Sequence, residues 1–441
     1  MPAQAQAEPR TGTPGKNSYA YVVTYVATSS APPPDSKMPP YDTRDAPTNR
    51  TKEPRVGRHT GTNLQPGNMN KSESNASHTK DDTGNSLEGD AFKRVQTRHR
   101  KSTHIVTDEV IDFRRPSDSR VIPVSSSTIG LAPSSPRLYG LSTHPGFVFA
   151  PACLSPDFQE RLAYQSLSQY CEHPHRTNID LVPIKPDTEE DDDRRIWDIW
   201  KAIHNFDGQE ERGKKRQRKE DRGTNTTDKA KQLKPYRSPK KLSWATMGYH
   251  YDWTHRTYTE AAQSEMPTEL QQLSEELLKM LPNCGSFKAS AAIVNYYNHK
   301  SLMRGHRDEL EYDFTKPVIS MSLGLSAIFL LGGKTREEPP VPLLIRPGDV
   351  IFLAGESRLA YHGMAKVVPN EPEYDASHGG MHSNSEISFS LNSQLPSIPE
   401  SERLAVKAFL STHRININLR QVLPDGVDCI SDLQTKEVGL Q

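Results

Sequence analysis

Two short His-x-Asp motifs are the residues of this sequence whose types and spacing best suit metal chemistry. They are His250-Tyr251-Asp252 and His306-Arg307-Asp308. Residues i and i+2 of a strand point to the same side, so each motif offers an imidazole and a carboxylate to one ion. A non-haem Fe(II) centre of the facial-triad type needs this pair and a second imidazole. With 16 His and 55 Asp plus Glu among 441 residues, about two such motifs arise by chance, so their surroundings must decide between them.

The surroundings favour the second motif. His306 follows an apolar run, Ala291–Tyr297, and a further histidine, His362, lies beyond several strand-like runs. These residues predict a metal site formed by His306, Asp308 and His362, with open positions for an oxidant and a co-substrate. His250-Tyr251-Asp252 has no comparable sequel, and we interpret it as a structural or substrate-side element.

The segment Arg414–Arg420 has the sequence RININLR and alternates without error. As a strand it places three aliphatic residues on one face and two arginines with two asparagines on the other. Two arginines are unusual on a strand face that meets only water. A guanidinium matches a carboxylate in a bidentate manner, so this face predicts the wall of a cavity that holds an acidic co-substrate.

The elements that must position these residues are mainly short strands in the C-terminal half. Before them, the sequence predicts a strand at Gly146–Ala150 and a helix that begins near Ser155-Pro156-Asp157. Arg346–Asp349 carries Pro and Gly at the centre of a predicted type II turn. We expect an α+β protein with a jelly-roll (double-stranded β-helix) core. The predicted strands of that core are Ala291–Tyr297, Val318–Leu323, Ala327–Leu331, Leu343–Ile345, Val350–Ala354 and Arg414–Arg420.

Composition divides the chain into regions. Residues 1–135 are rich in Pro, Ser, Thr, Asn and charge and poor in apolar residues, so we predict that they are disordered. The catalytic domain is expected over 136–425, with a C-terminal tail over 426–441. Within the domain, residues 212–241 contain 13 Lys or Arg and 3 Asp or Glu. They predict a flexible basic insertion, either a solvated loop or a nuclear-localisation or nucleic-acid-contacting loop around Lys214–Lys219.

Composition also excludes several classes of function. The formal net charge is zero, so binding to nucleic acid would have to rest on local basic patches. The four cysteines are scattered without a CxxC pair, which argues against a disulfide framework or a four-cysteine zinc site. No apolar run approaches the ~20 residues needed to span a bilayer. We expect an intracellular monomer with no membrane association, in the nucleus or else in the cytoplasm or mitochondrion.

Several motifs in a fixed order resemble the AlkB family of Fe(II)- and 2-oxoglutarate-dependent dioxygenases. They are Asn295-Tyr296-Tyr297, the His306 motif, SLGLSAIFLLGG from Ser322, PGDVIFLAGESRLAYHG from Pro347, and RININLR. Two further segments, Tyr139–Phe147 and Trp244–Trp253, are similar to the eukaryotic branch called AlkB homologue one. The chain departs from the family at Asn418, where many members carry Thr.

This resemblance implies a role for each matching residue. Three would hold Fe(II): His306, Asp308 and His362. Five would bind 2-oxoglutarate, with Arg414 on its distal carboxylate and Arg420 near Asp308: Asn295, Tyr297, Arg414, Asn416 and Arg420. Four would lie on the substrate side: Trp244, Tyr249, Tyr251 and Arg336. For these aromatic residues ordinary packing is the alternative, and for Arg336 the alternative is a solvated hairpin charge.

The implied activity is oxidative demethylation of N-methylated bases, of the 1-methyladenine or 3-methylcytosine type, in tRNA or DNA. Fe(II), 2-oxoglutarate and O2 would be required, and formaldehyde, succinate and CO2 would be released. Two alternatives remain at this point. One keeps the iron chemistry with a protein substrate such as a histone tail, and the other is a non-catalytic scaffold.

Overall fold

The structure is a computed structural model that describes residues 89–103, 105, 108–124, 138–181, 195–206, 239–252, 255, 257–282, 285–369 and 395–433. All of them belong to one of the two compact units into which the chain divides. Within these ranges, no helix is long and apolar enough to cross a membrane. Most of the basic insertion lies outside them; its last three residues form the 3-10 helix η4 (Pro239–Lys241).

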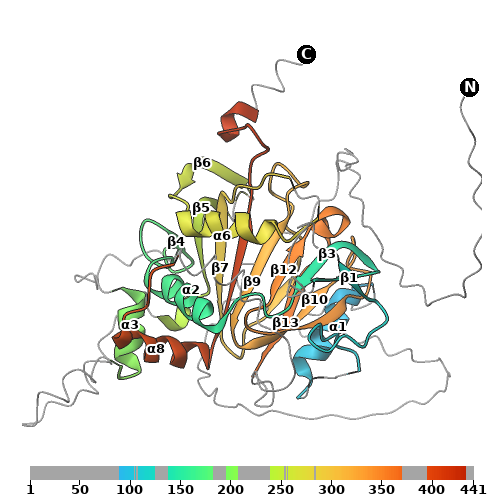
Figure 1. Cartoon of the computed structure of the whole chain (residues 1–441), viewed down its shortest axis with the longest axis horizontal. Helices are drawn as coiled ribbons and strands as arrows, with labels where there is room; N and C mark the ends of the chain where they lie inside the picture. Colours follow the sequence, from blue (N-terminus) through green and yellow to red (C-terminus); the bar gives the residue numbers. More distant parts are fainter. Residues whose placement is uncertain are drawn as a thin grey trace, which may run out of the picture. The chain divides into compact units, whose positions relative to one another are not determined.

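Two antiparallel sheets form the framework of the site (Figure 1). The major sheet has the strand order β1-β2-β3-β12-β9-β14-β7-β5-β4, and β6 pairs with β5 off this path. Its strands are β1 (Val121–Val124), β2 (Leu138–Leu141), β3 (His144–Ala150), β4 (Arg176–Thr177), β5 (Trp244–Asp252), β6 (Thr257–Gln263), β7 (Ala291–Tyr297), β9 (Val318–Gly324), β12 (Val350–Leu353) and β14 (Arg414–Arg420).

The minor sheet has the order β11-β10-β13-β8. Its strands are β8 (Met303–His306), β10 (Ser326–Leu331), β11 (Val341–Ile345) and β13 (His362–Val368). The two antiparallel sheets confirm the predicted jelly-roll core. The turn between β11 and β12 places Gly348 at a φ of 86°, the left-handed conformation that the third position of a type II turn requires.

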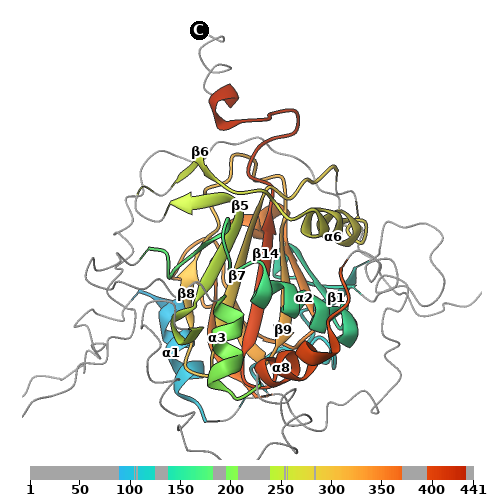
Figure 2. The ribbon, with the colours of Figure 1, turned by 90° about the vertical axis from the view of Figure 1, so that its left-hand side faces the viewer.

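Helices cover one face of the major sheet. They are α2 (Pro156–Ser168), α3 (Ile196–Ile203), α6 (Thr268–Leu278) and α8 (Glu400–Leu410), and Figure 2 shows α2, α3 and α8 in front of the central strands. The predicted start of α2 is confirmed: Pro156 occupies its first turn, and the Ser155 hydroxyl accepts a hydrogen bond from the Phe158 amide. The 3-10 helix η5 (Gly355–Leu359) precedes β13.

The alternation of β14 decides which side of the major sheet carries the chemistry. Ile415, Ile417 and Leu419 are fully buried in the large core beneath the helices. Because alternate residues of a strand point to opposite faces, Arg414 and Arg420 lie on the other, polar face. β14 lies between β7 and β9, so this polar face runs along the middle of the sheet.

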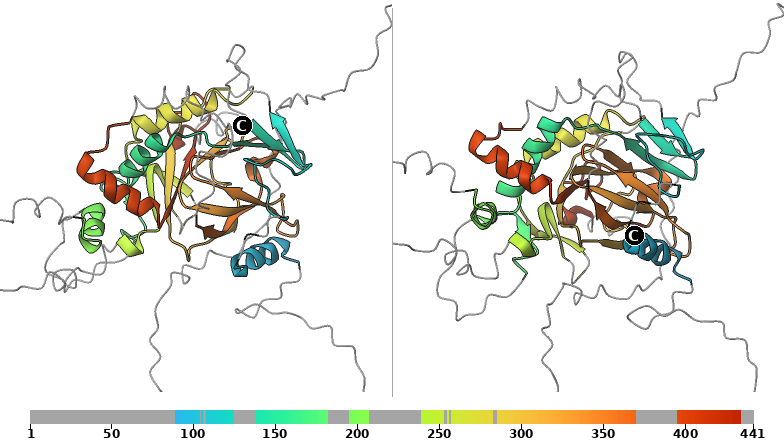
Figure 3. Two further views of the ribbon diagram at one scale, coloured as in Figure 1. Left: turned by 60° about the horizontal axis from the view of Figure 1, so that its bottom comes forward. Right: turned by 90° about the horizontal axis from the view of Figure 1, so that it is seen from below.

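The prediction of disorder over 1–135 is wrong for part of that range. Helix α1 (Ala91–Lys101) packs on β8 and β13 of the minor sheet, apart from the other helices (Figure 3). Phe92 on this helix is fully buried, and Phe113 stacks on Phe149 of β3 with ring centroids 4.3 Å apart. A low average of apolar residues concealed these few anchors. Residues 1–88 lie outside the described residues, where disorder stays a prediction.

Candidate active site

The pairing of β8 with β13 brings the two predicted histidine ligands together. His306 ends β8, His362 begins β13, and the two are register partners with ring centroids 4.4 Å apart. Asp308 follows two residues after His306. Its carboxylate oxygens lie 3.9 Å from His306 Nε2 and 3.7 Å from His362 Nε2. One ligand atom from each residue therefore lies within 4.8 Å of the others, as a shared metal ion requires.

Backbone carbonyls fix the orientation of both rings. His306 Nδ1 lies 2.9 Å from the carbonyl oxygen of Arg304, and His362 Nδ1 lies 3.0 Å from that of Ala360. A carbonyl only accepts, so each Nδ1 must carry the hydrogen. The lone pair of each Nε2 is left to bind a metal, and the hydrogen bond at Nδ1 makes the ring a better ligand.

The protonation of the site suits a cation. Burial, reinforced by the neighbouring His306, lowers the pKa of His362 to about 4, so its ring is neutral at physiological pH. Burial alone would raise the pKa of Asp308. The nearby Arg420 and the two histidines outweigh this effect and hold the pKa of Asp308 well below its ordinary value. Two neutral imidazoles and one carboxylate are the ligand set of a non-haem Fe(II) centre.

The co-substrate wall follows from the pairing of β14 with its neighbours. Arg414 is opposite Tyr297, and Asn416 is opposite Asn295, so all four predicted residues share one face. The Asn416 amide donates to the Ser320 hydroxyl and to the Met321 carbonyl, which fixes it against β9. Arg420 instead forms an ion pair with Asp308, with 2.8 Å between Nη2 and Oδ2.

Arg414 is a buried cation whose hydrogen bonds reach only neutral groups. It is 4% exposed and donates to the Ser322 hydroxyl at 2.8 Å and the Leu325 carbonyl at 3.2 Å. Its buried Nε has no partner among the described residues. Burial lowers the pKa of Arg414 to about 10. A guanidinium in this state fits the carboxylate of an acidic ligand, so the residues present fit 2-oxoglutarate.

The predicted substrate-side aromatics lie on β5. Trp244 is the register partner of Asn295, and cross-strand partners share a face, so it belongs to the polar wall. Tyr249 and Tyr251 are buried in a cluster with Tyr258 of β6 and with Val422 and Leu423. Their contact with substrate stays a prediction beside this packing role.

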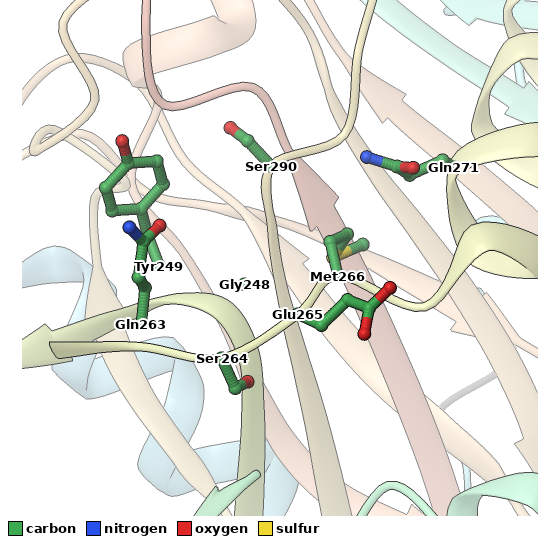
Figure 4. Close-up of a pocket in the computed structure, with 8 residues that line it drawn as sticks. All are labelled: Gly248, Tyr249, Gln263, Ser264, Glu265, Met266, Gln271 and Ser290. Carbon is green, nitrogen blue, oxygen red and sulfur yellow. The ribbon is translucent and has the colours of Figure 1, made fainter. Parts of the chain in front are cut away.

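Two features around this cluster differ from expectation. Residues 426–433, predicted as part of a tail, pack on it through Val427, Ile430 and Leu433. Tyr249 also lines a cavity of about 400 Å³ between β5, β6 and α6 (Figure 4). No predicted iron or 2-oxoglutarate residue lines that cavity.

His250 is a buried structural histidine. Its Nδ1 lies 2.8 Å from the Thr246 hydroxyl, and burial lowers its pKa to about 4. Among the residues that the structure describes, it belongs to no metal-binding group. The structural interpretation of His250-Tyr251-Asp252 is consistent with this placement.

Arg336 is bonded within the protein beside the site. Its guanidinium pairs with Asp90, the N-cap of α1, at 2.8 Å and donates to the Gly305 carbonyl at 2.9 Å. It also lies over the Tyr361 ring. Gly305 and Tyr361 immediately precede the two histidine ligands, so Arg336 joins α1 to the metal strands. Its contact with substrate stays a prediction.

Sequence reasoning missed the residues that support the metal strands from behind. The Gln96 amide of α1 donates to the Met303 carbonyl of β8 at 2.6 Å and to the Met364 carbonyl of β13 at 3.3 Å. It bridges the two strands where their register shifts. Glu311 and Arg358 form a buried ion pair close to Asp308. A charged residue within the otherwise apolar run before His362 was the available signal for Arg358.

We expect Gly305→Ala to destabilise the fold by about 1–3 kcal/mol, as overpacking in a core does. A Cβ atom at Gly305 would lie 2.6 Å from two ring carbons of the fully buried Phe92, so α1 would have to move away from β8. The free energy of unfolding in urea measures the effect. Gly285→Ala is the control, because a Cβ there meets nothing within 4 Å. Equal stability of the two variants would contradict the docking of α1.

The comparisons with known proteins agree with this geometry. The family model described as the 2OG-Fe(II) oxygenase superfamily matches residues 201–420. The Homo sapiens protein named nucleic acid dioxygenase ALKBH1 is 31% identical over 76% of this chain and 84% of its own. The Arabidopsis thaliana DNA N(6)-methyladenine demethylase ALKBH1A is 31% identical over 70% and 81%, and the Schizosaccharomyces pombe tRNA demethylase abh1 is 29% identical over 77% and 98%.

The fold and the site together define an Fe(II)- and 2-oxoglutarate-dependent dioxygenase. Bound iron supplies the activation of O2 as 2-oxoglutarate is oxidised, and the protein holds and orients the reactants. The chain belongs to the AlkB family, and its relatives named above are of the ALKBH1 type. It is an oxidoreductase that uses Fe(II), 2-oxoglutarate and O2, so the scaffold interpretation is not retained.

Proposed function

We propose that this enzyme removes N-methyl groups from bases of nucleic acid, with 1-methyladenine and 3-methylcytosine in tRNA or DNA as the substrate type. One oxygen atom of O2 enters the methyl group and the other enters succinate. The hydroxymethyl group then leaves as formaldehyde, and CO2 is released from 2-oxoglutarate. The names of the three relatives, which refer to nucleic acid, DNA and tRNA, support this substrate class.

The observation that carries the proposal is the pairing of the metal triad with a buried arginine that has no acidic partner. Arg414 lies on the polar wall of the sheet that also carries Arg420, and Arg420 binds the ligand Asp308. A carboxylate held by Arg414 would therefore belong to the same site as the metal. A methylated base must leave its stack to reach such a site, and aromatic walls favour a flipped base. Trp244, which shares the face of Asn295, is the proposed base-side residue on this wall.

The test is a matched set of oligonucleotides in RNA and DNA, each with 1-methyladenine or 3-methylcytosine. The protein is loaded with Fe(II) and 2-oxoglutarate without oxygen and then exposed to air. We expect methyl loss with formaldehyde and succinate in equal amounts. The relative rates would rank the two nucleic acids. Succinate formed without methyl loss from any oligonucleotide would overturn the proposed substrate and direct attention to methylated protein tails.

We infer that the basic insertion contributes phosphate contacts. Replacement of the five Lys and Arg of Lys214–Lys219 by Gln should weaken binding to nucleic acid and flatten its salt dependence. Each lost phosphate contact lowers the slope of log affinity against log salt by about 0.9 for duplex DNA or about 0.7 for single strands. Fluorescence anisotropy over a range of salt concentrations measures this slope. Lys279→Gln, which removes one exposed charge, is the control, and an unchanged slope would contradict the contact.

The same basic cluster supports a nuclear location, because short Lys/Arg-rich runs serve as nuclear-localisation signals. A fluorescent fusion of the full chain should accumulate in the nucleus, and the Gln variant should not. Equal nuclear accumulation of both would leave the cluster without a role in transport.

A further inference from the structure

Four buried charged side chains form a cluster next to the metal site: Asp308, Glu311, Arg358 and Arg420. Each side chain is at most 8% exposed. Arg420 bridges the two acids, with its Nη2 2.8 Å from Asp308 Oδ2 and its Nε 3.5 Å from Glu311 Oε1. Glu311 thus shares with a metal ligand the arginine that orients it.

Arg358 holds the other side of the cluster. Its Nη2 lies 2.8 Å from Glu311 Oε2, and its remaining nitrogens donate to the backbone carbonyls of Asp308 at 2.5 Å and Lys316 at 2.9 Å. Arg358 therefore fixes the backbone of the metal ligand as well as the carboxylate of Glu311. The two cations and two anions balance, so loss of one charge would leave another buried without compensation.

Glu311 has a third contact, which comes from the β5–β6 hairpin. The Tyr258 hydroxyl donates to Glu311 Oε1 at 3.2 Å. The Tyr258 ring meets the rings of Tyr251 and Tyr249 edge to face, at 5.7 and 6.4 Å between centroids. Tyr258 and Arg420 thus converge on the same carboxylate oxygen, and Glu311 is the point where the hairpin and the metal ligand meet.

We propose that Glu311 is a positioning residue for the iron centre, which holds Arg420 so that Arg420 sets the direction of the Asp308 carboxylate. Arg358 and Tyr258 keep Glu311 in place, and through Tyr258 the packing of the β5–β6 hairpin bears on the metal ligand. This role rests on the iron chemistry of the site and not on the choice of substrate. Glu311 itself does not reach the metal.

The test is Glu311→Gln, which removes the charge and keeps the size. Fe(II) alone is titrated anaerobically into the full chain by calorimetry, and the visible charge-transfer absorption of its chelate with 2-oxoglutarate is then recorded. We expect Fe(II) to bind about 10- to 100-fold more weakly, as when the partners of metal ligands are lost elsewhere. The chelate absorption should shift. Glu309→Gln is the matched control: it lies in the same loop, and its carboxylate pairs with Arg307 at the surface.

Wild-type Fe(II) affinity and an unshifted absorption in a folded Glu311→Gln protein would overturn the proposal. If that variant does not fold, Tyr258→Phe decides, because it keeps all four charges and the packed ring. Loss of one hydrogen bond to a carboxylate should weaken Fe(II) binding about tenfold, and an unchanged affinity would refute the role. Neither measurement uses nucleic acid, so failure of the proposed substrate would not affect the result.

Discussion

His306→Ala should lose Fe(II) binding at the triad and, with it, both succinate formation and methyl loss. Removal of residues that only support a metal ligand costs about 10- to 100-fold in metal affinity, so loss of a ligand itself should exceed 100-fold. His306 supplies one of three ligand atoms that lie within 4.8 Å of one another. Its ring is already oriented by the Arg304 carbonyl, so no rearrangement would bring a replacement. Anaerobic Fe(II) titration and succinate measurement check this result.

The second His-x-Asp motif of the chain provides the control for this prediction. His250 is also buried, but its ring bonds to Thr246 and lies in no metal-binding group of the described residues. His250→Asn should therefore still bind one Fe(II). If His250→Asn loses the metal and His306→Ala keeps it, the assignment of the triad is wrong.

The strands that carry these residues could be predicted because their signals are local. Arg414–Arg420 alternates in sequence, and its aliphatic residues are fully buried. Ala291–Tyr297 is apolar throughout, and all seven of its residues are buried, as in a strand covered on both faces. A period of two within seven residues is enough to divide the faces of a strand.

Contacts between distant segments could not be predicted in this way. Nothing in the spacing of His306 and His362 specifies that β8 and β13 pair in the register that sets them opposite each other. The resemblance to a family supplied that juxtaposition. Glu311 and Arg358 likewise meet only because η5 comes back beside the loop after β8, and no periodic pattern marks such a pair.

Helix α1 was missed for a related reason. Its sequence, AFKRVQTRHRK, is mostly polar, and a helix of this length is marginal without tertiary packing. Its stability comes from a few docked groups: Phe92 beneath Gly305 and Gly332, Gln96 across two strands, and Asp90 with Arg336. Average composition over the N-terminal region does not reveal such anchors.

Arg414→Met should raise the 2-oxoglutarate concentration needed for half-maximal succinate formation by about 30-fold or more. Truncation of one partner of a buried charge pair costs at least about 2 kcal/mol, and each 1.4 kcal/mol is a factor of ten. The buried Nε of Arg414 has no partner among the described residues, so the pair would form only with the co-substrate. Arg414→Lys keeps a charge without the bidentate fork and should lie between the two.

The effect of Arg414→Met should also be visible without turnover. A ligand that binds only the folded state raises its stability with concentration, so 2-oxoglutarate should raise the melting temperature of the Fe(II)-loaded wild type much more than that of the variant. Fe(II) affinity should hardly change, because Asp308 is paired with Arg420 and not with Arg414. Arg420→Met should show the opposite division, with weakened Fe(II) binding. If both arginine variants lose only 2-oxoglutarate affinity, the two residues form one anion site, and the separate role of Arg420 at Asp308 is refuted.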